Sequence, residues 1–307
     1  MKEYLAKKRS RERLTFGFYL LMLPLLITVL FTFPSCSKKP AEKKTEPALK
    51  INKVKDVSFS GSTGQTVNIL FLGSDSRSES VEGLSDAIMV VHLDLKDNSA
   101  TLISFPRDSR VPIPGHGTNK INSAFFSGGP ELTIQTIEEL TGIDIHYYAI
   151  TTFSGFTRII DNLGGVQITL DRSIRDRWSG ANFPSGAQKL TGEQALAFCR
   201  ARHIPGGDLG RAAHHQDLLF AVFEQERHKN DPQHLFVLVD ILVHNCETNI
   251  SFKEIFELAK IAVQVQPDRI TKTVLPGKTS DIKGGSYVIL DQNQLTQTFE
   301  KIKNSDD

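Results

Sequence analysis

The stretch TVNILFLGSDSR, residues 66–77, decides how the chain folds. Its first eight residues are mostly branched or aliphatic and end in Gly73. A short apolar run of this kind that closes on a glycine is typical of a buried β-strand. The polar residues that follow place Asp75 and Arg77 just beyond the strand. The stretch therefore predicts a core strand with charged side chains at the edge of its sheet.

Strand and helix patterns alternate along the rest of the chain. Residues 86–106 read as a β-hairpin around the turn KDN. Further strands are expected at residues 146–153, 166–170, 271–275 and 286–290. Helices are expected at residues 130–141, 154–163, 191–199, 212–229, 233–244, 252–265 and 292–302. This order predicts an α/β fold in which a central, mostly β sheet carries helices on both faces. Ligands of such folds bind beyond the carboxyl ends of the strands.

The first 64 residues read as a membrane segment and a linker. Residues 1–13 carry six basic side chains, and residues 14–34 form a run of 21 residues without a charge, long enough to span a bilayer. Residues 1–35 fit either an uncleaved signal anchor or a lipoprotein signal peptide that ends before Cys36. Residues 36–64 form a Lys-rich linker, and residues 65–305 form the folded domain. The basic start favours a domain on the outer face of the cell membrane.

Charge is distributed unevenly along the chain. Residues 1–60 hold 13 Lys and Arg against 5 Asp and Glu, which leaves 23 basic and 30 acidic residues in the remainder. An acidic body lacks the broad positive field that nonspecific nucleic-acid binding needs, so we expect no nucleic-acid partner. Three cysteines do not make a disulfide framework; free thiols are favoured, with a Cys199–Cys246 bridge left open.

Aspartate and arginine cluster at the ends or starts of the expected strands and in one loop. The clusters are GSDSR at 73–77, SDAIM at 85–89, SFPRDSR at 104–110 and CRARHIPGGDLGR at 199–211. Each alone is also typical of an exposed turn or a surface ion pair. Together they offer two carboxylates, which suit Mg²⁺ with phosphate oxygens, and several arginines, which bind phosphate through paired hydrogen bonds. Without a Ser-His-Asp or Cys-His arrangement, the clusters predict a diphosphate site for phosphoryl transfer.

The loop at 199–211 sets a geometric condition. Side chains two residues apart share one side of an extended chain but lie on different sides of a helix. Arg200 and Arg202 therefore serve one ligand only if the helix that starts at Thr191 ends before them.

These motifs resemble the LytR-CpsA-Psr family over residues 66–225, in order and in spacing. The resemblance rests on the segments NILFLGSDSR, SDAIMVVHLD, LISFPRDSRVPIPGHGTNKINSAFFSGG, NLGGVQITL and LTGEQALAFCRARHIPGGDLGR. Enzymes of this family transfer a glycopolymer phosphate from a polyprenyl-diphosphate carrier to a peptidoglycan hydroxyl, outside the cytoplasmic membrane. The resemblance implies these two substrates and the membrane as partners, and an apolar cavity for the prenyl tail.

The resemblance also assigns roles to residues. Asp75 and Asp86 would hold Mg²⁺, or Mn²⁺ in its place. The diphosphate would be bound by Arg77, Arg107, Arg200, Arg202, Arg211, His214, His215 and Gln216. The catalytic residues would be Asp75, Arg107, Asp208 and Arg211, with Asp208 orienting an arginine or assisting proton transfer.

One segment departs from the family pattern. After Arg211 the family continues Arg-x-x-Arg-Gln-Gln, whereas this chain reads RAAHHQ, so that only Gln216 matches. If His214 faces the diphosphate, the anion should raise its pKa; otherwise His214 lies on the outer face of its helix. A zinc site formed by His203, Asp208, His214 and His215 is a further alternative.

Three functions stay open at this point. The first is a membrane-anchored transferase of a lipid-linked glycan to the cell wall. The second keeps the site and uses water as the acceptor, which makes the protein a polyprenyl-diphosphate hydrolase. The third is a regulatory or lipid-phosphate-binding protein of the envelope without activity, although an acidic body without a helix-turn-helix argues against control of transcription.

Overall fold

The computed structural model describes residues 66–76, 83–202, 205–229 and 231–306. The chain divides into two units, Met1–Ala48 and Leu49–Asp307, and every described residue belongs to the second. The expected membrane segment, Cys36 and the Lys-rich linker therefore lie outside the described residues. Within the described ranges, no helix combines the length and the apolar character that a membrane crossing requires.

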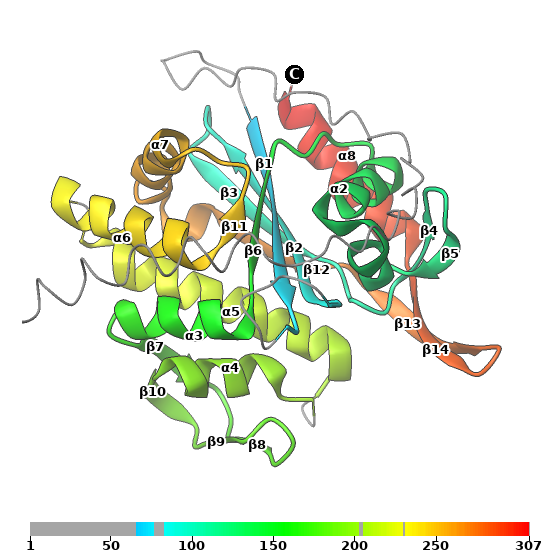
Figure 1. Cartoon of the computed structure of the whole chain (residues 1–307), viewed down its shortest axis with the longest axis horizontal. Coiled ribbons are helices and arrows are strands. Elements are labelled where there is room, and N and C mark those ends of the chain that lie inside the picture. The colour runs from blue at the N-terminus through cyan, green and yellow to red at the C-terminus, as the bar shows by residue number, and fades with distance from the viewer. Residues whose placement is uncertain (1–65, 77–82, 203–204, 230, 307) are drawn as a thin grey trace, which may run out of the picture. The chain divides into compact units, whose positions relative to one another are not determined.

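A six-stranded sheet forms the centre of the second unit, in the order β11-β6-β1-β2-β3-β12 (Figure 1). These strands are, in that order, Glu247–Thr248, Tyr147–Thr151, Thr66–Ser74, Ser85–Asp94, Ser99–Ser104 and Ile270–Val274. The sheet is mixed: β1, β2 and β3 pair antiparallel, whereas β6 and β12 run parallel to β1 and β3. The predicted hairpin and the central position of the first strand are confirmed.

Helices cover both faces of the sheet, as predicted (Figure 1). They are α2 (Asn122–Thr141) and α8 (Gln292–Asp306) on one face, and α3 (Phe153–Asn162), α5 (Gly207–Arg227), α6 (Pro232–Asn245) and α7 (Phe252–Ala262) on the other. The alternation along β1 explains this arrangement. Leu70 and Leu72 join the core with α2 and α8, whereas Val67 and Ile69 join the core with α7. A strand with two apolar faces needs cover on both sides.

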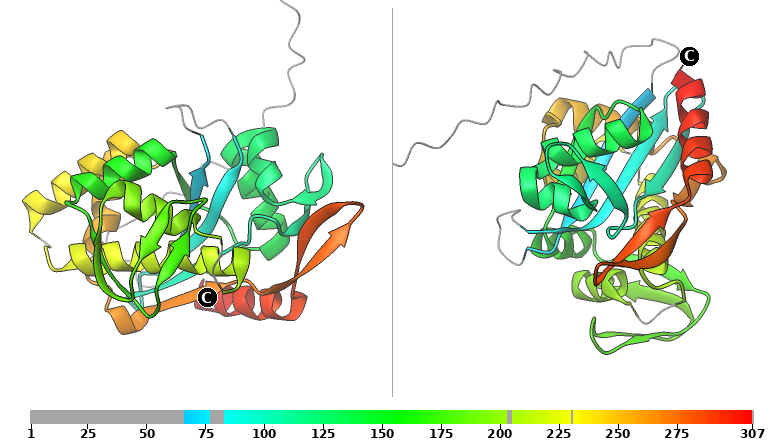
Figure 2. Two further views of the ribbon diagram at one scale, coloured as in Figure 1. Left: turned by 90° about the horizontal axis from the view of Figure 1, so that it is seen from below. Right: turned by 90° about the vertical axis from the view of Figure 1, so that its right-hand side faces the viewer.

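A smaller core lies beside the main sheet. It is built from α4 (Gly192–Arg200) and the strands β7 (Val166–Leu170), β8 (Ile174–Asp176), β9 (Ala181–Phe183) and β10 (Gly186–Leu190). The right-hand view of Figure 2 shows this part at the lower end of the unit. Two hairpins complete the described chain, β4 (Arg110–Ile113) with β5 (Gly117–Lys120) and β13 (Gly277–Ile282) with β14 (Gly285–Leu290).

Two helices begin earlier than the sequence patterns indicate. A helical segment that starts at Asn122 precedes the helix expected at Pro130. The two are joined across a kink at Gly128 and Gly129, where the backbone is not helical, and together they form α2. The helix expected at residue 212 starts at Gly207, where Gly206 and Gly207 both adopt positive φ angles and turn the chain. The second shift brings Asp208 and Arg211 onto one helix.

The strand register fixes where the predicted site residues meet. Ser74 pairs with Ser85, and Met89 pairs with Ser104. The end of β1, the start of β2 and the end of β3 therefore share one edge of the sheet. Asp75, Asp86 and Arg107 all stand at this edge.

Candidate active site at the edge of the sheet

Asp75 and Asp86 flank the loop that joins β1 to β2. The backbone N–H of Asp75 donates to the carbonyl of Leu84, and the N–H of Leu84 donates to Oδ1 of Asp75, both at 3.1 Å. Gly83 has φ +135°, and a Cβ there would lie 2.5 Å from Oδ1 of Asp75, so only glycine fits. These bonds hold the Asp75 carboxylate beside the start of β2, where it and Asp86 line one cavity.

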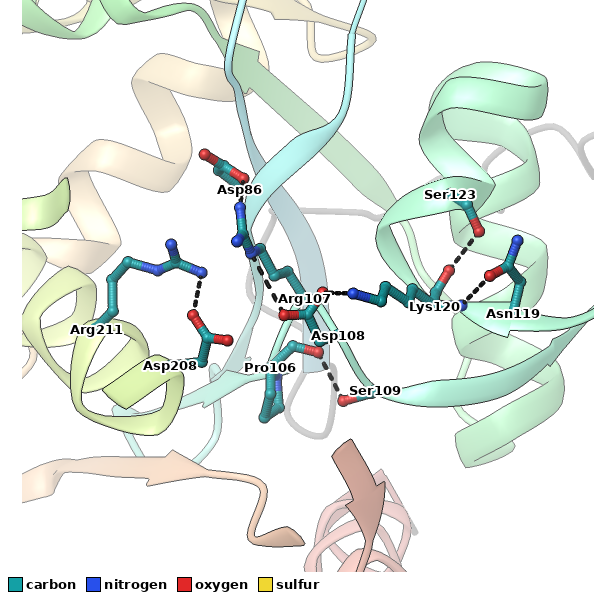
Figure 3. Close-up of polar contacts among 10 residues, drawn as sticks. All are labelled: Asp86, Pro106, Arg107, Asp108, Ser109, Asn119, Lys120, Ser123, Asp208 and Arg211. Carbon is teal, nitrogen blue, oxygen red and sulfur yellow. Dashed lines mark hydrogen bonds and ion pairs between the residues drawn. The ribbon is translucent and has the colours of Figure 1, made fainter. Parts of the chain in front are cut away.

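Arg107 follows β3 and lies between two carboxylates (Figure 3). Its Nη1 forms an ion pair with Oδ1 of Asp86, and its Nε lies 3.8 Å from Oδ2 of Asp108. Lys120 approaches Asp108 from the other side, with 2.8 Å between Nζ and Oδ1. Nε of Arg107 is buried without a hydrogen-bond partner among the described residues. Since an unpaired buried donor is costly, this N–H is available to an anionic ligand.

The charges at this edge stabilise one another's ionised forms. Burial lowers the pKa of Arg107, but the Asp86 carboxylate and its hydrogen bond outweigh burial and leave the pKa above its ordinary value. Burial raises the pKa of Asp108, but hydrogen bonds with Lys120 and Asp208 and the charge of Arg107 leave the pKa below its ordinary value. Both side chains are therefore charged at neutral pH.

The start of α5 contributes a second arginine and carboxylate pair. Arg211 is 4% exposed, and its Nη2 lies 2.7 Å from Oδ1 of Asp208. Burial and the nearby charge of Arg107 both lower the pKa of Arg211, while Asp208 and Asp86 raise it. A negatively charged ligand near both guanidinium groups would relieve this repulsion.

The helix from Thr191 ends at Arg200 and not before it, so the condition that the sequence sets for Arg200 and Arg202 is met only for Arg202. Helix α4 ends at Arg200, and Ala201 is extended, with φ −62° and ψ 127°. The Arg200 guanidinium lies 4.9 Å from the centre of the Phe153 ring. The backbone N–H of Arg202 donates to Oδ2 of Asp176 at 2.6 Å. Both arginines line the same cavity as Asp75 and Asp86.

This cavity has a volume of about 860 Å³ and combines a charged part with an apolar part. Its polar lining comes from the charged side chains of Asp75, Asp86, Arg200, Arg202 and Arg211 and from the ring of His215. Its apolar lining comes from the sheet and from helices α3, α4, α5 and α6, and includes Phe71, Met89, Phe156, Ile159, Leu196, Leu218, Val222 and Leu242. Trp178, 70% exposed, also borders it. The cavity suits a ligand with an anionic head and a long apolar tail.

Cys199 and Cys246 line the cavity as free thiols, so the bridge between them that the sequence left open is not formed. Burial raises the pKa of Cys199 to about 12 and that of Cys246 to about 11. Thiols of such high pKa are poor nucleophiles, and both side chains serve as apolar lining.

The structure places the three residues after Ala213 in three different environments. His215 lines the cavity, and its Nε2 donates to the carbonyl of Cys199 at 3.1 Å. Burial, and then the charge of Arg211, lower the pKa of His215 to about 4, so its ring is neutral at neutral pH. It can offer the ligand an imidazole but no permanent charge.

His214 and Gln216 do not lie where we predicted them. The His214 ring stacks on Phe198, with ring centres 4.2 Å apart, and burial lowers its pKa. Gln216 is 3% exposed, and its Nε2 donates to the carbonyls of Leu102 and Thr273 and to Oγ of Ser104. Gln216 thus ties α5 to the sheet, and neither side chain lines the 860 Å³ cavity.

Two predicted residues lie outside the described residues, namely Arg77 and His203. Conversely, three residues lie at the site for which no role was predicted. Asp108 and Lys120 stand in the quoted motifs, and their opposite charges could have indicated an ion pair. Asp176 could not be predicted, because it accepts a hydrogen bond from Arg202, which is 26 positions away in the sequence.

The donor set at the site suits Mg²⁺ better than zinc. Among the described residues, no group of three or more His, Cys, Asp and Glu side chains is arranged to hold a metal, and this includes Asp208, His214 and His215. Asp75 and Asp86 provide two carboxylates beside the arginines. Mg²⁺ is usually bound by one or two carboxylates with phosphate oxygens and water, so these two residues fit it.

The fold and the cavity define a class of α/β protein in which a mixed sheet carries, at one end of its strands, a cavity with a charged part and a long apolar part. Within this class the family is clear. The profile described as the LytR_cpsA_psr family matches residues 31–304, and the chain belongs to this family.

Two relatives named as TagU are similar to the chain over most of its folded domain. The chain is 34% identical over 201 residues to a protein of Bacillus mycoides named polyisoprenyl-teichoic acid–peptidoglycan teichoic acid transferase TagU, a match that covers 65% of each chain. The chain thus spans slightly less than two thirds of that relative. It is 30% identical over 252 residues to the TagU of Halalkalibacterium halodurans, covering 81% of this chain and 82% of the relative.

Solved structures share the fold. TagV of B. subtilis superposes with a TM-score of 0.72 at 26% identity and covers 80% of this chain and 98% of its own. The family protein YwtF (TagT) with bound octaprenyl pyrophosphate lipid superposes with a TM-score of 0.61 at 25% identity, covering 78% of this chain and 90% of its own.

Proposed function

We propose that this protein is a membrane-anchored phosphotransferase that moves a glycopolymer phosphate from a polyprenyl-diphosphate carrier to peptidoglycan. The observation that carries the proposal is the 860 Å³ cavity, in which Asp75, Asp86 and three arginines adjoin a long apolar lining. A prenyl diphosphate has the matching shape and charge. The relatives named as teichoic acid transferases, and the family structure with octaprenyl pyrophosphate, support the same assignment.

In the proposed reaction, the oxygen of a peptidoglycan hydroxyl forms a bond to the phosphorus that carries the glycan. The bond between this phosphorus and the bridging oxygen breaks, and the electron pair leaves with the prenyl monophosphate. Arg107 and Arg211 stabilise the negative charge on the phosphate oxygens as these bonds change. Arg200 and Arg202 hold the diphosphate from the end of α4.

Asp208 is the residue we assign to accept the hydroxyl proton. Its side chain is 32% exposed, against 21% for Asp86 and 15% for Asp108. Of these three carboxylates it is therefore the most accessible to an acceptor that arrives from solvent. Its bond to Arg211 keeps it beside the phosphate.

The proposal includes a metal and a location. Asp75 and Asp86 would hold Mg²⁺, or Mn²⁺, which when bound supplies positive charge to the diphosphate oxygens. Residues 14–34, or a lipid on Cys36, would attach the protein to the cell membrane with its folded domain on the outer face.

The test uses the purified full chain in detergent, with a prenyl-diphosphate-linked glycan and peptidoglycan strands. We expect glycan bound covalently to peptidoglycan and one prenyl monophosphate released per transfer, with Arg107→Ala as the inactive control. Release of monophosphate without any attachment would make the protein a hydrolase. Absence of both products, while the chain is folded and Mg²⁺ is present, would contradict the proposal.

A further inference from the structure

A second cavity, of about 960 Å³, lies along α5 next to the site. One wall is β7 with the following segment, through Gln167, Thr169, Arg172, Ser173 and Arg175. Lys272 of β12 stands on the other wall, and α5 forms the floor. We call this cavity the α5 groove. It contains His214, one of the two residues at which the sequence departs from the family pattern.

Helix α5 separates the α5 groove from the cavity of the candidate active site. Arg211, His215, Leu218 and Val222 recur every three or four residues and line the active-site cavity. A second set with the same spacing, Gly210, His214, Asp217 and Ala221, lines the α5 groove. A ligand in each cavity would therefore lie against the same helix.

The α5 groove reaches the catalytic end of this helix. Gly210, which lines the groove, directly precedes Arg211, which pairs with Asp208. The groove wall is also tied to the active site. Asp176 directly follows Arg175; it is 2% exposed, and its Oδ2 accepts the backbone N–H of Arg202 at 2.6 Å. The end of the groove is thus held in a fixed position relative to Arg202 and Arg211.

The lining of the α5 groove combines ring faces, hydrogen-bonding groups and charges of both signs. The ring of His214 lies on its floor, stacked on the buried ring of Phe198, and Lys272 lies 5.0 Å from the centre of the Phe220 ring. Nζ of Lys272 is also 2.7 Å from Oδ1 of Asp217. Aromatic faces beside amides and hydroxyls suit sugar rings, and charges of both signs suit a peptide with amino and carboxyl groups. A nucleic acid or a polyphosphate would need a uniformly basic lining.

We propose that the α5 groove binds the acceptor, a peptidoglycan strand with its short peptide, and delivers its hydroxyl to Asp208 and the diphosphate. The inference rests on the proposed function and adds the position and chemistry of the second substrate. His214 belongs to this acceptor site, which explains how the chain tolerates the loss of an arginine there.

The test blocks the α5 groove without altering the diphosphate site. Thr169 is exposed on β7, so Thr169→Trp fills the groove from its wall, and Ala213→Trp fills it from α5 in case the first variant misfolds. Glu300→Trp, on the exposed side of α8, is the matched control. The full chain in detergent is titrated with soluble peptidoglycan fragments released by muramidase and, separately, with a prenyl diphosphate.

We expect each groove variant to weaken fragment binding, and to raise the KM for peptidoglycan, by about tenfold or more. Prenyl-diphosphate binding should stay within about twofold of wild type, and Glu300→Trp should leave both ligands unaffected. Unchanged fragment affinity in a folded groove variant would overturn the acceptor assignment while leaving the transferase intact. Failure of the wild-type chain to bind prenyl diphosphate would instead contradict the proposed function.

Discussion

Nη2 of Arg211 lies 2.7 Å from Oδ1 of Asp208, three residues earlier on α5. The side chain of Arg211 is 5% exposed and that of Asp208 is 32% exposed. The arginine is therefore buried in the protein, whereas the carboxylate can be reached from solvent. This asymmetry gives Asp208 two effects that experiments can separate, namely orientation of Arg211 and acceptance of a proton. An amide at position 208 keeps the hydrogen bond and loses the base.

Asp208→Asn should therefore lower kcat by about 100-fold or more, the usual contribution of a general base, while diphosphate affinity stays near that of wild type. Asp208→Ala should lower both, because Arg211 then loses its partner. Transfer rates and calorimetry with a prenyl diphosphate measure the two effects. A wild-type kcat in Asp208→Asn, beside weakened diphosphate binding in Asp208→Ala, would show that Asp208 acts only by positioning the arginine.

Arg107→Ala should cost about 2 kcal/mol or more in diphosphate binding, because it removes charge-assisted hydrogen bonds in a partly buried site. The same substitution leaves Asp86 and Asp108 without their shared cation. Arg107→Lys should recover only part of the loss, since lysine lacks the second arm of the guanidinium. Arg110→Ala, at an exposed strand position, is the control. A loss of binding free energy below about 0.5 kcal/mol, which is typical of an exposed ion pair, would mean that Arg107 does not bind the diphosphate.

Asp86→Asn should raise the Mg²⁺ concentration needed for half-maximal transfer and weaken Mg²⁺ binding in the presence of a prenyl diphosphate. The substitution removes one ligand charge and also one partner of Arg107. Asp97→Asn, in the exposed turn after β2, is the control. Calorimetric titration with Mg²⁺ measures metal binding separately from the rate of transfer. The same metal dependence in wild type and Asp86→Asn would remove Asp86 from the metal site.

The parts that the sequence predicts well are those set by local rules. The hairpin of β2 and β3 follows from two apolar runs on either side of a tight turn, and α4 begins with a capping box of Thr191 and Gln194. The meeting of Asp75, Asp86 and Arg107 follows from strand ends that share one edge of a sheet. Short strands such as β8 and β11 were missed. Pairing with the distant β6 holds β11 in place, and β8 is only three residues long and pairs with β9 in a small hairpin.

The orientation of α5 is the part that no local rule supplies. The helix begins five residues before its expected start, and the burial of Gln216 against β3 and β12 sets its rotation. This rotation turns His215 to the active site and His214 to the α5 groove. Reading the two histidines from a linear motif could not reveal that they face different cavities.

The position of His214 leads to a prediction opposite to the one that the motif suggests. His214→Arg should leave diphosphate affinity within about twofold of wild type between about pH 6 and pH 8, since the ring stacks on Phe198 away from that cavity. The measurement is prenyl-diphosphate affinity against pH for both proteins. A gain in affinity at the higher pH in His214→Arg would place this side chain back at the diphosphate.

The buried cluster around Glu226 sets how the stability of the fold responds to acid. Glu226 is 3% exposed, and its carboxylate accepts hydrogen bonds from Lys229 at 3.0 Å, Gln225 at 3.1 Å and His234 at 2.6 Å. Burial raises the pKa of Glu226, but these bonds and the charge of Lys229 outweigh it and leave the pKa below the ordinary value of 4.5.

A folded-state pKa below the unfolded one makes the unfolded chain bind more protons, so the stability from Glu226 is present above about pH 4.5 and is lost as pH falls through the folded pKa. Glu226→Gln should therefore lower the free energy of unfolding at pH 7 by about 2 kcal/mol, the range of a charged hydrogen bond. The difference from wild type should shrink below pH 4.5, because protonation then removes the same charge in wild type. Glu257→Gln, which removes a more exposed ion pair with Lys260, should change stability by less than about 1 kcal/mol at any of these pH values. The free energy of unfolding of the three proteins is measured by urea unfolding at several pH values. A difference in this free energy between wild type and Glu226→Gln that stays constant down to pH 3 would contradict the depressed pKa.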